Sequence, residues 1–420
     1  MASEERAAPE VTPSRPTRPV PLWRNRSYLL LWSGQAISSI GGEASHLAFP
    51  LLILAVTHSP AQAGFAGALR ALAYLLLGLP AGALIDRWDR KRTMMICDAG
   101  RALALGSIPL ALATNSLTMA QIYLVSVIEG SLFVFFGLAE FSALPHVVEK
   151  SQLPAATAQN EVTSGVVTFI GPALGGALFG VARALPFLVD AVSYAASVFS
   201  LSWIRLPFQE ERVRKPASLR ADIREGIMWL WREPVIRSLM LLHSGLILSY
   251  EGMLLLVLVI AEHQHASPLI IGLMFGISGV GSILGALLGA QVHKRLQLGQ
   301  ILVAAFWLFA LLWPLYAIAP SPLALGVVLA AFWVVDETYD VAQISYRQTL
   351  IPDAVRGRVI GAFRLVAFTC EALSTGLTGL LLQRFGALTT IAVFECALVA
   401  LAIAATLNRS LRLARPIADL

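Results

Sequence analysis

The sequence predicts an all-α integral membrane protein of twelve transmembrane helices, arranged as two pseudo-symmetric six-helix bundles. The chain of 420 residues is 57% hydrophobic and only 14% charged, with a mean hydropathy of +0.71, whereas a soluble domain is nearer a quarter charged. Long apolar runs recur along the chain, each near or above the ~20 residues that cross a bilayer. A polar, basic stretch divides the first six runs from the last six.

Each apolar run is expected to be a helix, because a segment in lipid must satisfy its own backbone hydrogen bonds. Several runs exceed the minimum length, so tilt or extension beyond the lipid is expected. The weakest divisions separate the fifth run from the sixth, at 183–186, and the eleventh from the twelfth, at 383–386. The expected spans are residues 27–56, 62–85, 93–113, 118–145, 160–182, 185–206, 236–261, 267–291, 299–319, 322–347, 357–383 and 387–408.

The expected organisation has two bundles, a linker and two tails. The linker is expected to carry an amphipathic helix at 217–232 that lies on the membrane surface. The N-terminal tail is rich in Pro, Arg, Glu and Ala, which predicts disorder. The five parts are a cytosolic tail at 1–22, an N-terminal bundle at 23–206, a cytosolic linker at 207–235, a C-terminal bundle at 236–408 and a cytosolic tail at 409–420.

Basic residues predict the orientation, because they gather on the cytoplasmic side of membrane proteins. With a cytoplasmic N-terminus, the inner segments hold 26 of the 31 Lys and Arg residues, and the outer loops hold only Arg183 and Arg384. We therefore expect a multi-pass protein with both termini in the cytoplasm. The same distribution explains the net charge of +5 by topology, so no nucleic-acid partner is expected.

The sequence carries no pattern for a cofactor, a metal or a reaction. The cysteines, Cys97, Cys370 and Cys396, lie far apart inside apolar runs, which predicts neither a metal site nor a disulfide framework. The sequence also contains no Walker phosphate loop, nucleophile elbow or zinc spacing. We expect no cofactor, no enzymatic activity and no ATP-driven transport by this chain alone.

The loop after the second span carries the most specific motif of the chain. It reads Gly-Ala-Leu-Ile-Asp-Arg-Trp-Asp-Arg-Lys-Arg at 82–92. This resembles the loop between the second and third helices of major facilitator superfamily transporters, roughly Gly-x-x-x-Asp-Arg/Lys-x-Gly-Arg-Arg/Lys. Asp89 stands where the family usually has glycine. The residues that match are Gly82, Asp86, Arg87, Arg90 and Lys91.

The resemblance covers about residues 22–410 and is closest to the bacterial drug-efflux branch, of drug:proton antiporter type, which includes macrolide and siderophore exporters. It implies the bacterial inner membrane as the location, lipid as the surroundings and a monomer as the working unit. It also implies a small-molecule substrate and protons as partners. The supporting stretches are residues 23–26, 48–52, 153–157 and 352–359.

The resemblance also implies a gate at the Gly82 loop. In the family this loop locks the two halves together on the inner side and favours the outward-facing state. Asp86 would do so near the start of the eleventh span, around 355–358. A positively charged topology anchor is the alternative, and it explains Arg90 and Lys91 but not Asp86 at its spacing from Gly82.

The fifth span contains a glycine-rich segment that resembles the antiporter motif of drug exporters. Its residues are Gly171, Pro172, Gly175 and Gly176. Small residues permit close helix packing, and a proline kinks the helix. Generic close packing explains the segment equally well, since Val167 stands where the family usually has a further glycine.

Acidic residues within the spans are candidate proton-binding or substrate-binding groups, because a charge inside a membrane is costly and faces a cavity or a partner. A satisfied structural hydrogen bond is the alternative for each. Proton antiport rests on these acids alone, since Ser126 stands where many proton-coupled exporters carry an arginine. The candidates are Glu43, Glu129, Glu251 and Glu371.

A second acidic group lies in the tenth span. Asp336 and Asp340 are four residues apart and therefore share a helix face. With Arg364 on the next span as partner, or alternatively Arg347 and His293 at the inner rim, they predict a charge lock near the inner gate, in preference to a substrate site.

These features predict a secondary active transporter that effluxes a small amphipathic compound, drug-like or siderophore-like, by alternating access and with proton coupling. Apolar and aromatic residues such as Phe133, Phe136, Tyr250 and Trp333 are expected to hold the compound. One alternative is an importer or a transporter of a lipid-linked substrate on the same fold. The other is a non-transporting membrane sensor or an integral-membrane enzyme.

Overall fold

The computed structural model describes residues 21–85, 87–206, 208, 219–292 and 295–412, and in this part of the chain every regular element is a helix. The elements are η1 (Leu22–Arg24), α1 (Arg26–Thr57), α2 (Pro60–Ile85), α3 (Arg90–Ala113), α4 (Met119–Val147), η2 (Lys150–Gln152), α5 (Leu153–Val181), α6 (Leu185–Trp203), α7 (Leu219–Arg232), α8 (Pro234–Tyr250), α9 (Met253–His263), α10 (Pro268–Val292), α11 (Leu298–Leu312), α12 (Leu315–Ile318), α13 (Pro322–Leu350), α14 (Asp353–Leu407) and α15 (Arg409–Arg412).

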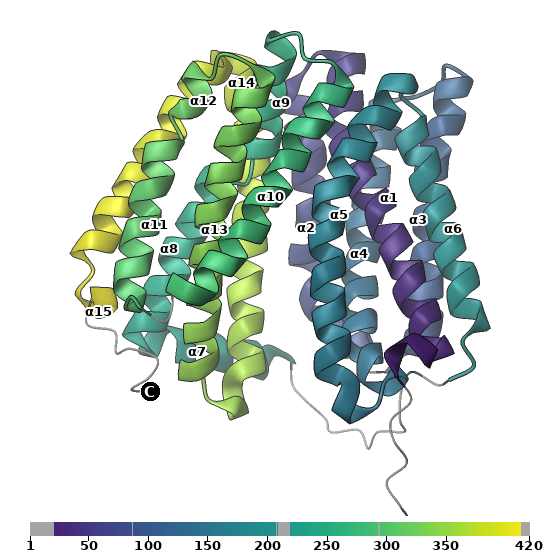
Figure 1. Cartoon of the computed structure of the whole chain (residues 1–420), viewed down its shortest axis with the longest axis horizontal. Helices are drawn as coiled ribbons and strands as arrows, with labels where there is room; N and C mark the ends of the chain where they lie inside the picture. The colour runs from purple at the N-terminus through teal and green to yellow at the C-terminus, as the bar shows by residue number, and fades with distance from the viewer. Residues whose placement is uncertain (1–20, 86, 207, 209–218, 293–294, 413–420) are drawn as a thin grey trace, which may run out of the picture.

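Eleven helical stretches among the described residues are long and apolar enough to cross a membrane. The last of them, Val355–Leu407, has 53 residues, far more than the ~20 that one crossing needs. At Gly386 the backbone leaves the helical region, with φ 76° and ψ 178°, and the lime and yellow arms of α14 separate (Figure 1). The stretch is therefore two spans joined by a very short turn, which makes twelve as predicted.

The fifth span differs from its prediction, because α5 begins at Leu153 rather than at 160. The prediction followed hydropathy, but the polar first turns of this helix include Glu161, which lines a cavity instead of lipid. The linker holds α7 where an amphipathic helix was expected. The predicted tails lie mostly outside the described residues, which begin at 21 and end at 412.

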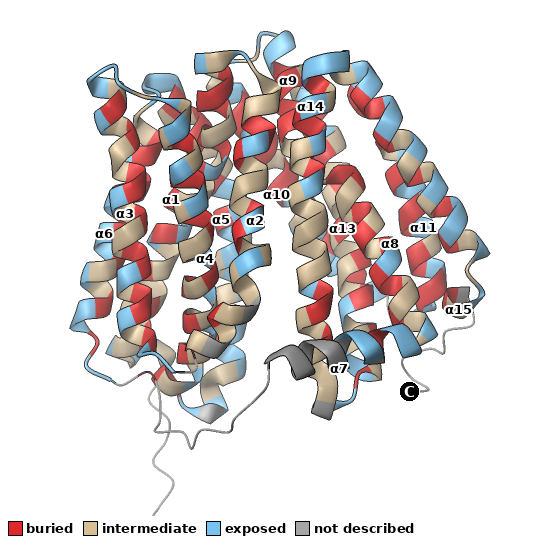
Figure 2. Ribbon diagram, turned by 180° about the vertical axis from the view of Figure 1, so that it is seen from behind, coloured by how far each residue is buried: buried red, intermediate tan, exposed pale blue. Residues whose placement is uncertain are grey.

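The helices form two bundles that stand side by side, α1 to α6 and α8 to α14 (Figure 1). The bundles meet along two helix pairs, α2 with α14 and α5 with α10. The described chain begins and ends at the same end of the molecule, where α7 lies across the second bundle (Figures 1 and 2). This end is called the terminal face below, and the opposite end is the far face.

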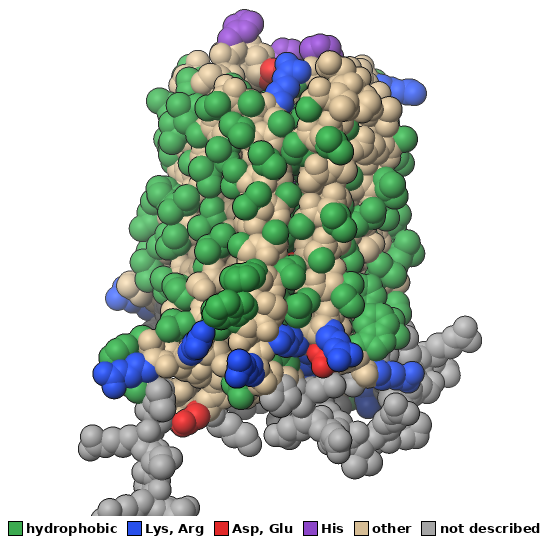
Figure 3. All heavy atoms as spheres, turned by 90° about the vertical axis from the view of Figure 1, so that its right-hand side faces the viewer, with side chains coloured by type: hydrophobic (Ala, Val, Ile, Leu, Met, Phe, Trp, Pro, Cys, Tyr) green, Lys and Arg blue, Asp and Glu red, His purple; other side chains and the backbone are tan. Residues whose placement is uncertain are grey.

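The outside of the bundles is apolar. Buried residues face the interior of each bundle (Figure 2), while large apolar side chains such as Leu103 and Phe141 are exposed on the outside. A space-filling view shows apolar side chains over the middle of the first bundle and basic side chains gathered toward the terminal face (Figure 3). A soluble monomer rarely exposes so large an apolar surface, and this band fits a protein that crosses a membrane several times.

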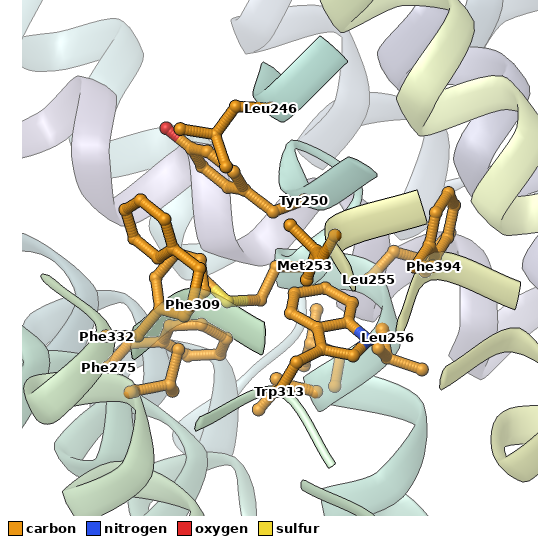
Figure 4. Packing of buried hydrophobic residues seen from close by; sticks show 14 of the residues in the cluster. Leu246, Tyr250, Met253, Leu255, Leu256, Phe275, Phe309, Trp313, Phe332 and Phe394 are labelled. Atoms are coloured by element: carbon orange, nitrogen blue, oxygen red, sulfur yellow. The ribbon is translucent and has the colours of Figure 1, made fainter. Parts of the chain in front are cut away.

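The interior of the second bundle contains a cluster of aromatic side chains packed with leucine and methionine (Figure 4). Phe309 lies at its centre, with its ring 4.8 Å from that of Phe332 and 6.2 Å from those of Tyr250 and Tyr339. Such pairs add about 0.5–1.5 kcal/mol beyond the area that they bury. The second bundle is thus held largely by apolar packing, with Asp336 buried beside these rings, whereas the first bundle buries both acidic and basic groups.

Candidate functional site

A cavity of about 1050 Å³ lies between the two bundles. Its wall is formed by α1, α2, α4 and α5 on one side and by α8, α9, α10, α13 and α14 on the other. Of the aromatic residues predicted to hold a compound, Phe133, Tyr250 and Trp333 line it. Phe136 was a wrong prediction, since it packs inside the first bundle. All four predicted acids line the cavity, namely Glu43, Glu129, Glu251 and Glu371.

The cavity is closed toward the far face by two helix crossings that contain glycine pairs. A Cβ built on Gly64 of α2 would lie 2.8 Å from the Cα of Gly379 in α14. A Cβ on Gly176 of α5 would lie 2.7 Å from the Cα of Gly272 in α10. Real Cβ atoms do not come this close to backbone, so the helices touch backbone to backbone. These are called the glycine crossings below.

The bundles are apart toward the terminal face. A Cβ built on Gly82, near the end of α2, would have nothing within 4 Å. The same holds for Gly357 and Gly361 near the start of α14, the partner that the sequence predicted for the Gly82 loop. The cavity therefore opens at the terminal face in this conformation. Asp86, the predicted acid of that lock, lies outside the described residues, as does His293, a candidate partner of the acids in the tenth span.

The basic residues of the Gly82 loop hold it within the first bundle. Arg90 is buried and donates to the carbonyls of Ser142 and Phe208, at 2.8 and 3.1 Å. Lys91 donates to the carbonyl of Ile204 at 2.5 Å. Arg87 is exposed. In this conformation the contacts of Arg90 and Lys91 fit the anchor role, and the gating role of the motif stays a prediction.

Asp89, which departs from the family pattern, caps α3. Its carboxylate accepts a hydrogen bond from the backbone N–H of Arg92 at 2.8 Å. An aspartate in this position satisfies one of the free N–H groups of the first turn. The departure from glycine thus has a local structural reason.

We expect Asp89→Ala to lower the free energy of unfolding by about 1 kcal/mol, because alanine cannot cap α3. Asp89→Gly, which restores the family residue, is expected to cost only a few tenths of a kcal/mol, roughly, because glycine is tolerated at a cap. Denaturant unfolding of the purified protein measures both variants. An equal loss in the two would contradict the capping role.

The glycine-rich segment of α5 packs on two sides. Gly171 and Gly175 face α1, where a Cβ on Gly175 would lie 2.9 Å from the Cα of Ala44. Gly176 faces α10 across the two bundles, and Pro172 lines the cavity. The segment therefore makes close helix packing within its own bundle and between bundles, while its link to antiport stays a prediction.

Glu129 forms the centre of a charged network in the first bundle. Its two carboxylate oxygens lie 2.6 Å from Nε of Arg70 and 3.0 Å from Nη2 of Arg101. Arg101 is buried and also lies 4.0 Å from Asp98, which accepts a hydrogen bond from Ser197 at 2.6 Å. Sequence reasoning did not assign Arg70 a role. Arg70 could have been found as a basic residue within a span, because a charge there requires a partner.

The predicted charge lock is not formed in this conformation. Asp336 accepts a hydrogen bond from the Tyr250 hydroxyl at 3.1 Å, and Asp340 accepts one from Gln343 at 2.8 Å. Arg364 is exposed, and within the described part of the chain no ion pair joins it to either aspartate. The lock stays a prediction for another state of the protein.

Solved transporter structures share the fold of this chain. A bacterial homologue of the iron transporter ferroportin in an inward-facing state superposes with a TM-score of 0.74 at 17% identity, covering 92% of this chain and 98% of that one. The nucleoside transporter NupG gives 0.73 at 14% identity, covering 91% and 98%. At these identities the likeness shows the fold.

The multidrug efflux pump Tap of Mycolicibacterium fortuitum is 25% identical over 399 residues, 91% of this chain and 96% of that protein. The enterobactin exporter EntS of Salmonella choleraesuis is 28% identical over 342 residues, 79% and 80% of the two chains.

The family described as transmembrane secretion effector matches residues 17–418, which is nearly the whole chain. Its members are transporters, so the predicted efflux class and the expectation of no enzymatic activity are confirmed, as is the all-α fold. The chain belongs to the transmembrane secretion effector family of the major facilitator superfamily.

Proposed function

We propose that the protein exports a small amphipathic compound from the cytoplasm by alternating access, working as a monomer within the lipid of the bacterial inner membrane. The cavity between the bundles is the observation that carries this proposal. It is about 1050 Å³, at the upper end of the range that accommodates drug-sized ligands. The cavity is closed toward the far face and open toward the terminal face, as expected for one of the two access states of an alternating-access transporter.

The direction follows from the basic side chains, which gather toward the terminal face (Figure 3). The positive-inside rule supports a cytoplasmic position for this face, and we propose on this ground that the described conformation faces inward. Tap and EntS are named as an efflux pump and an exporter, which supports outward transport over import.

In the proposed transport step, the far face opens and the terminal face closes. Separation of the glycine crossings opens the far face, while the Gly82 loop approaches the start of α14 and closes the terminal face. In that state Asp86 reaches the region of residues 355–358, and Asp336 and Asp340 pair with Arg364. Each bundle moves largely as a rigid body around the cavity, as in related carriers.

Proton coupling is proposed through the acids of the cavity. Glu251 and Glu371 both line it, and within the described residues neither forms an ion pair. Their carboxylates repel each other, and an unpaired charge in a membrane is costly. Binding a proton removes this cost, and the change of access delivers the proton to the other side.

We expect export by the reconstituted protein to stop when the pH gradient is collapsed, because the proton supplies the driving force. The measurement uses proteoliposomes loaded on one side with a fluorescent compound, with nigericin as the agent that collapses the gradient. Export that continues unchanged against a concentration gradient would overturn the coupling. Uptake into inverted vesicles tests direction, since an importer would empty them instead.

A further inference from the structure

The charged residues of the cavity are strongly unbalanced. Arg70 is the only lysine or arginine among the described residues that line it, and His46 is the only histidine. Against these stand six carboxylates from five helices and the α8–α9 connection, contributed by Glu43, Glu129, Glu161, Glu251, Glu337 and Glu371.

Arg70 is already committed to a partner. Its Nε lies 2.6 Å from Glu129, and Arg101 holds the other oxygen of the same carboxylate at 3.0 Å. The charge of the two arginines exceeds that of Glu129, but each guanidinium group is in contact with the Glu129 carboxylate. His46 lies 4.0 Å from Glu43. An anionic compound would thus enter a space where both basic groups have acidic partners and four further carboxylates remain.

The structure brings Glu251 and Glu371 together through a break in the seventh span. The helix is interrupted between α8 and α9 at Glu251 and Gly252. The N–H of Gly252 donates to Ser374 of α14 at 3.0 Å, and Thr378 packs where a side chain on Gly252 would be. This contact fixes the break against α14, the helix that carries Glu371. The two carboxylates repel each other, so a positive charge between them relieves the repulsion.

Aromatic rings lie beside these acids. Phe368 precedes Glu371 by about one helical turn and stacks on Tyr74, with ring centroids 3.6 Å apart. Trp333 of α13 also lines the cavity. Rings of this kind attract an organic cation through their faces and pack against its apolar parts. Within the described residues no group of acids, histidines or cysteines is arranged to hold a metal ion, which directs the choice to an organic cation.

We infer that the compound is an organic cation with apolar rings, held by Glu251 and Glu371 and by the aromatic wall. The inference rests on the proposed export function and names the class of its substrate.

The test compares two probes of nearly the same shape and opposite charge, tetraphenylphosphonium and tetraphenylborate. Both are titrated into the full-length protein in nanodiscs, and empty nanodiscs of the same lipid give the background. We expect saturable binding of tetraphenylphosphonium at least about tenfold tighter than that of tetraphenylborate, the size of one charge-assisted contact. Equal affinities, or tighter binding of the borate, would overturn the inference without any variant.

Substitutions locate the cation. Glu251→Gln and Glu371→Gln keep the size of the side chain, and each is expected to weaken tetraphenylphosphonium binding by about tenfold. Glu262→Gln is the matched control, because Glu262 is exposed at the end of α9 and outside the cavity. Thermal unfolding confirms that each variant is folded. Unchanged affinity in both folded cavity variants would contradict the assignment.

Transport assays separate this inference from the proposed function. Cells that lack their own pumps are challenged with cationic, neutral and anionic compounds. Protection against cations is expected, and it is expected to fall in the two cavity variants. Protection against neutral or anionic compounds alone overturns the cation inference and leaves export standing. Protection against none, together with no flux in vesicles, overturns export itself.

Discussion

Gly176→Leu is expected to slow transport strongly, because leucine does not fit between α5 and α10 at the far face. A Cβ there would lie 2.7 Å from the Cα of Gly272, and the rest of the side chain has no room. Overpacking of this kind costs about 1–3 kcal/mol, and the cost falls only on the state in which the far face is closed. The equilibrium shifts toward the opposite state by about ten- to a hundredfold.

Two measurements test this result. One is the transport of a fluorescent compound, and the other is the distance between positions 59 and 383. Ser59 and Gln383 are joined by a hydrogen bond of 2.8 Å at the far face, so spin labels at these two positions should separate in the variant. Gly64→Leu at the other glycine crossing is expected to act in the same direction. Gly137→Leu is the control, since Gly137 is exposed on α4 and a Cβ there meets nothing within 4 Å. Wild-type transport by Gly176→Leu would refute the closure.

Glu129→Gln is expected to lower the free energy of unfolding by about 3–5 kcal/mol, the cost of removing one partner from a buried ion pair. Glutamine keeps the shape of the side chain but leaves Arg70 and Arg101 without the carboxylate that lies 2.6 and 3.0 Å from them. Arg101 is buried, so water cannot replace the lost charge. Denaturant unfolding of the purified protein measures the loss.

A second substitution distinguishes charge balance from packing. Adding Arg101→Leu to Glu129→Gln removes one of the two unbalanced charges, so the double variant should be more stable than the sum of the single changes predicts. Glu43→Gln is the matched control, because Glu43 lines the same cavity and lies 4.0 Å from a histidine instead of beside an arginine. Equal losses in Glu129→Gln and Glu43→Gln would contradict the network.

The sequence predicted the helices well because lipid imposes one simple requirement on each. Apolar length marks a span, and basic residues mark the side on which it ends. The prediction was wrong at the start of α5, where the polar turns near Glu161 face the cavity. Hydropathy measures contact with lipid, so it cannot recognise a helix turn that lies inside the protein and faces a polar space.

The individual residues of the site could be predicted from the sequence, but their contacts with residues on other helices could not. Acids within the spans, such as Glu129 and Glu371, were found because a charge in a span is rare. The partner of Glu129 was not found, since Arg70 lies 59 residues away on another helix. Likewise Gly176 was part of a motif, but its contact with Gly272 lies across two bundles. Such pairs depend on how each helix is rotated, which hydropathy does not specify.

The glycine crossings have a consequence for the range of compounds that the protein handles. In a gate built from interlocking side chains, the transported compound would have to fit past those side chains as they move apart. At Gly64 and Gly176 backbone meets backbone, so apart from the Ser59–Gln383 hydrogen bond these crossings place little side-chain shape in the path of a leaving compound. The choice between compounds is then made by the cavity, and a single substitution in the cavity wall can allow a new compound to bind without affecting release at the far face.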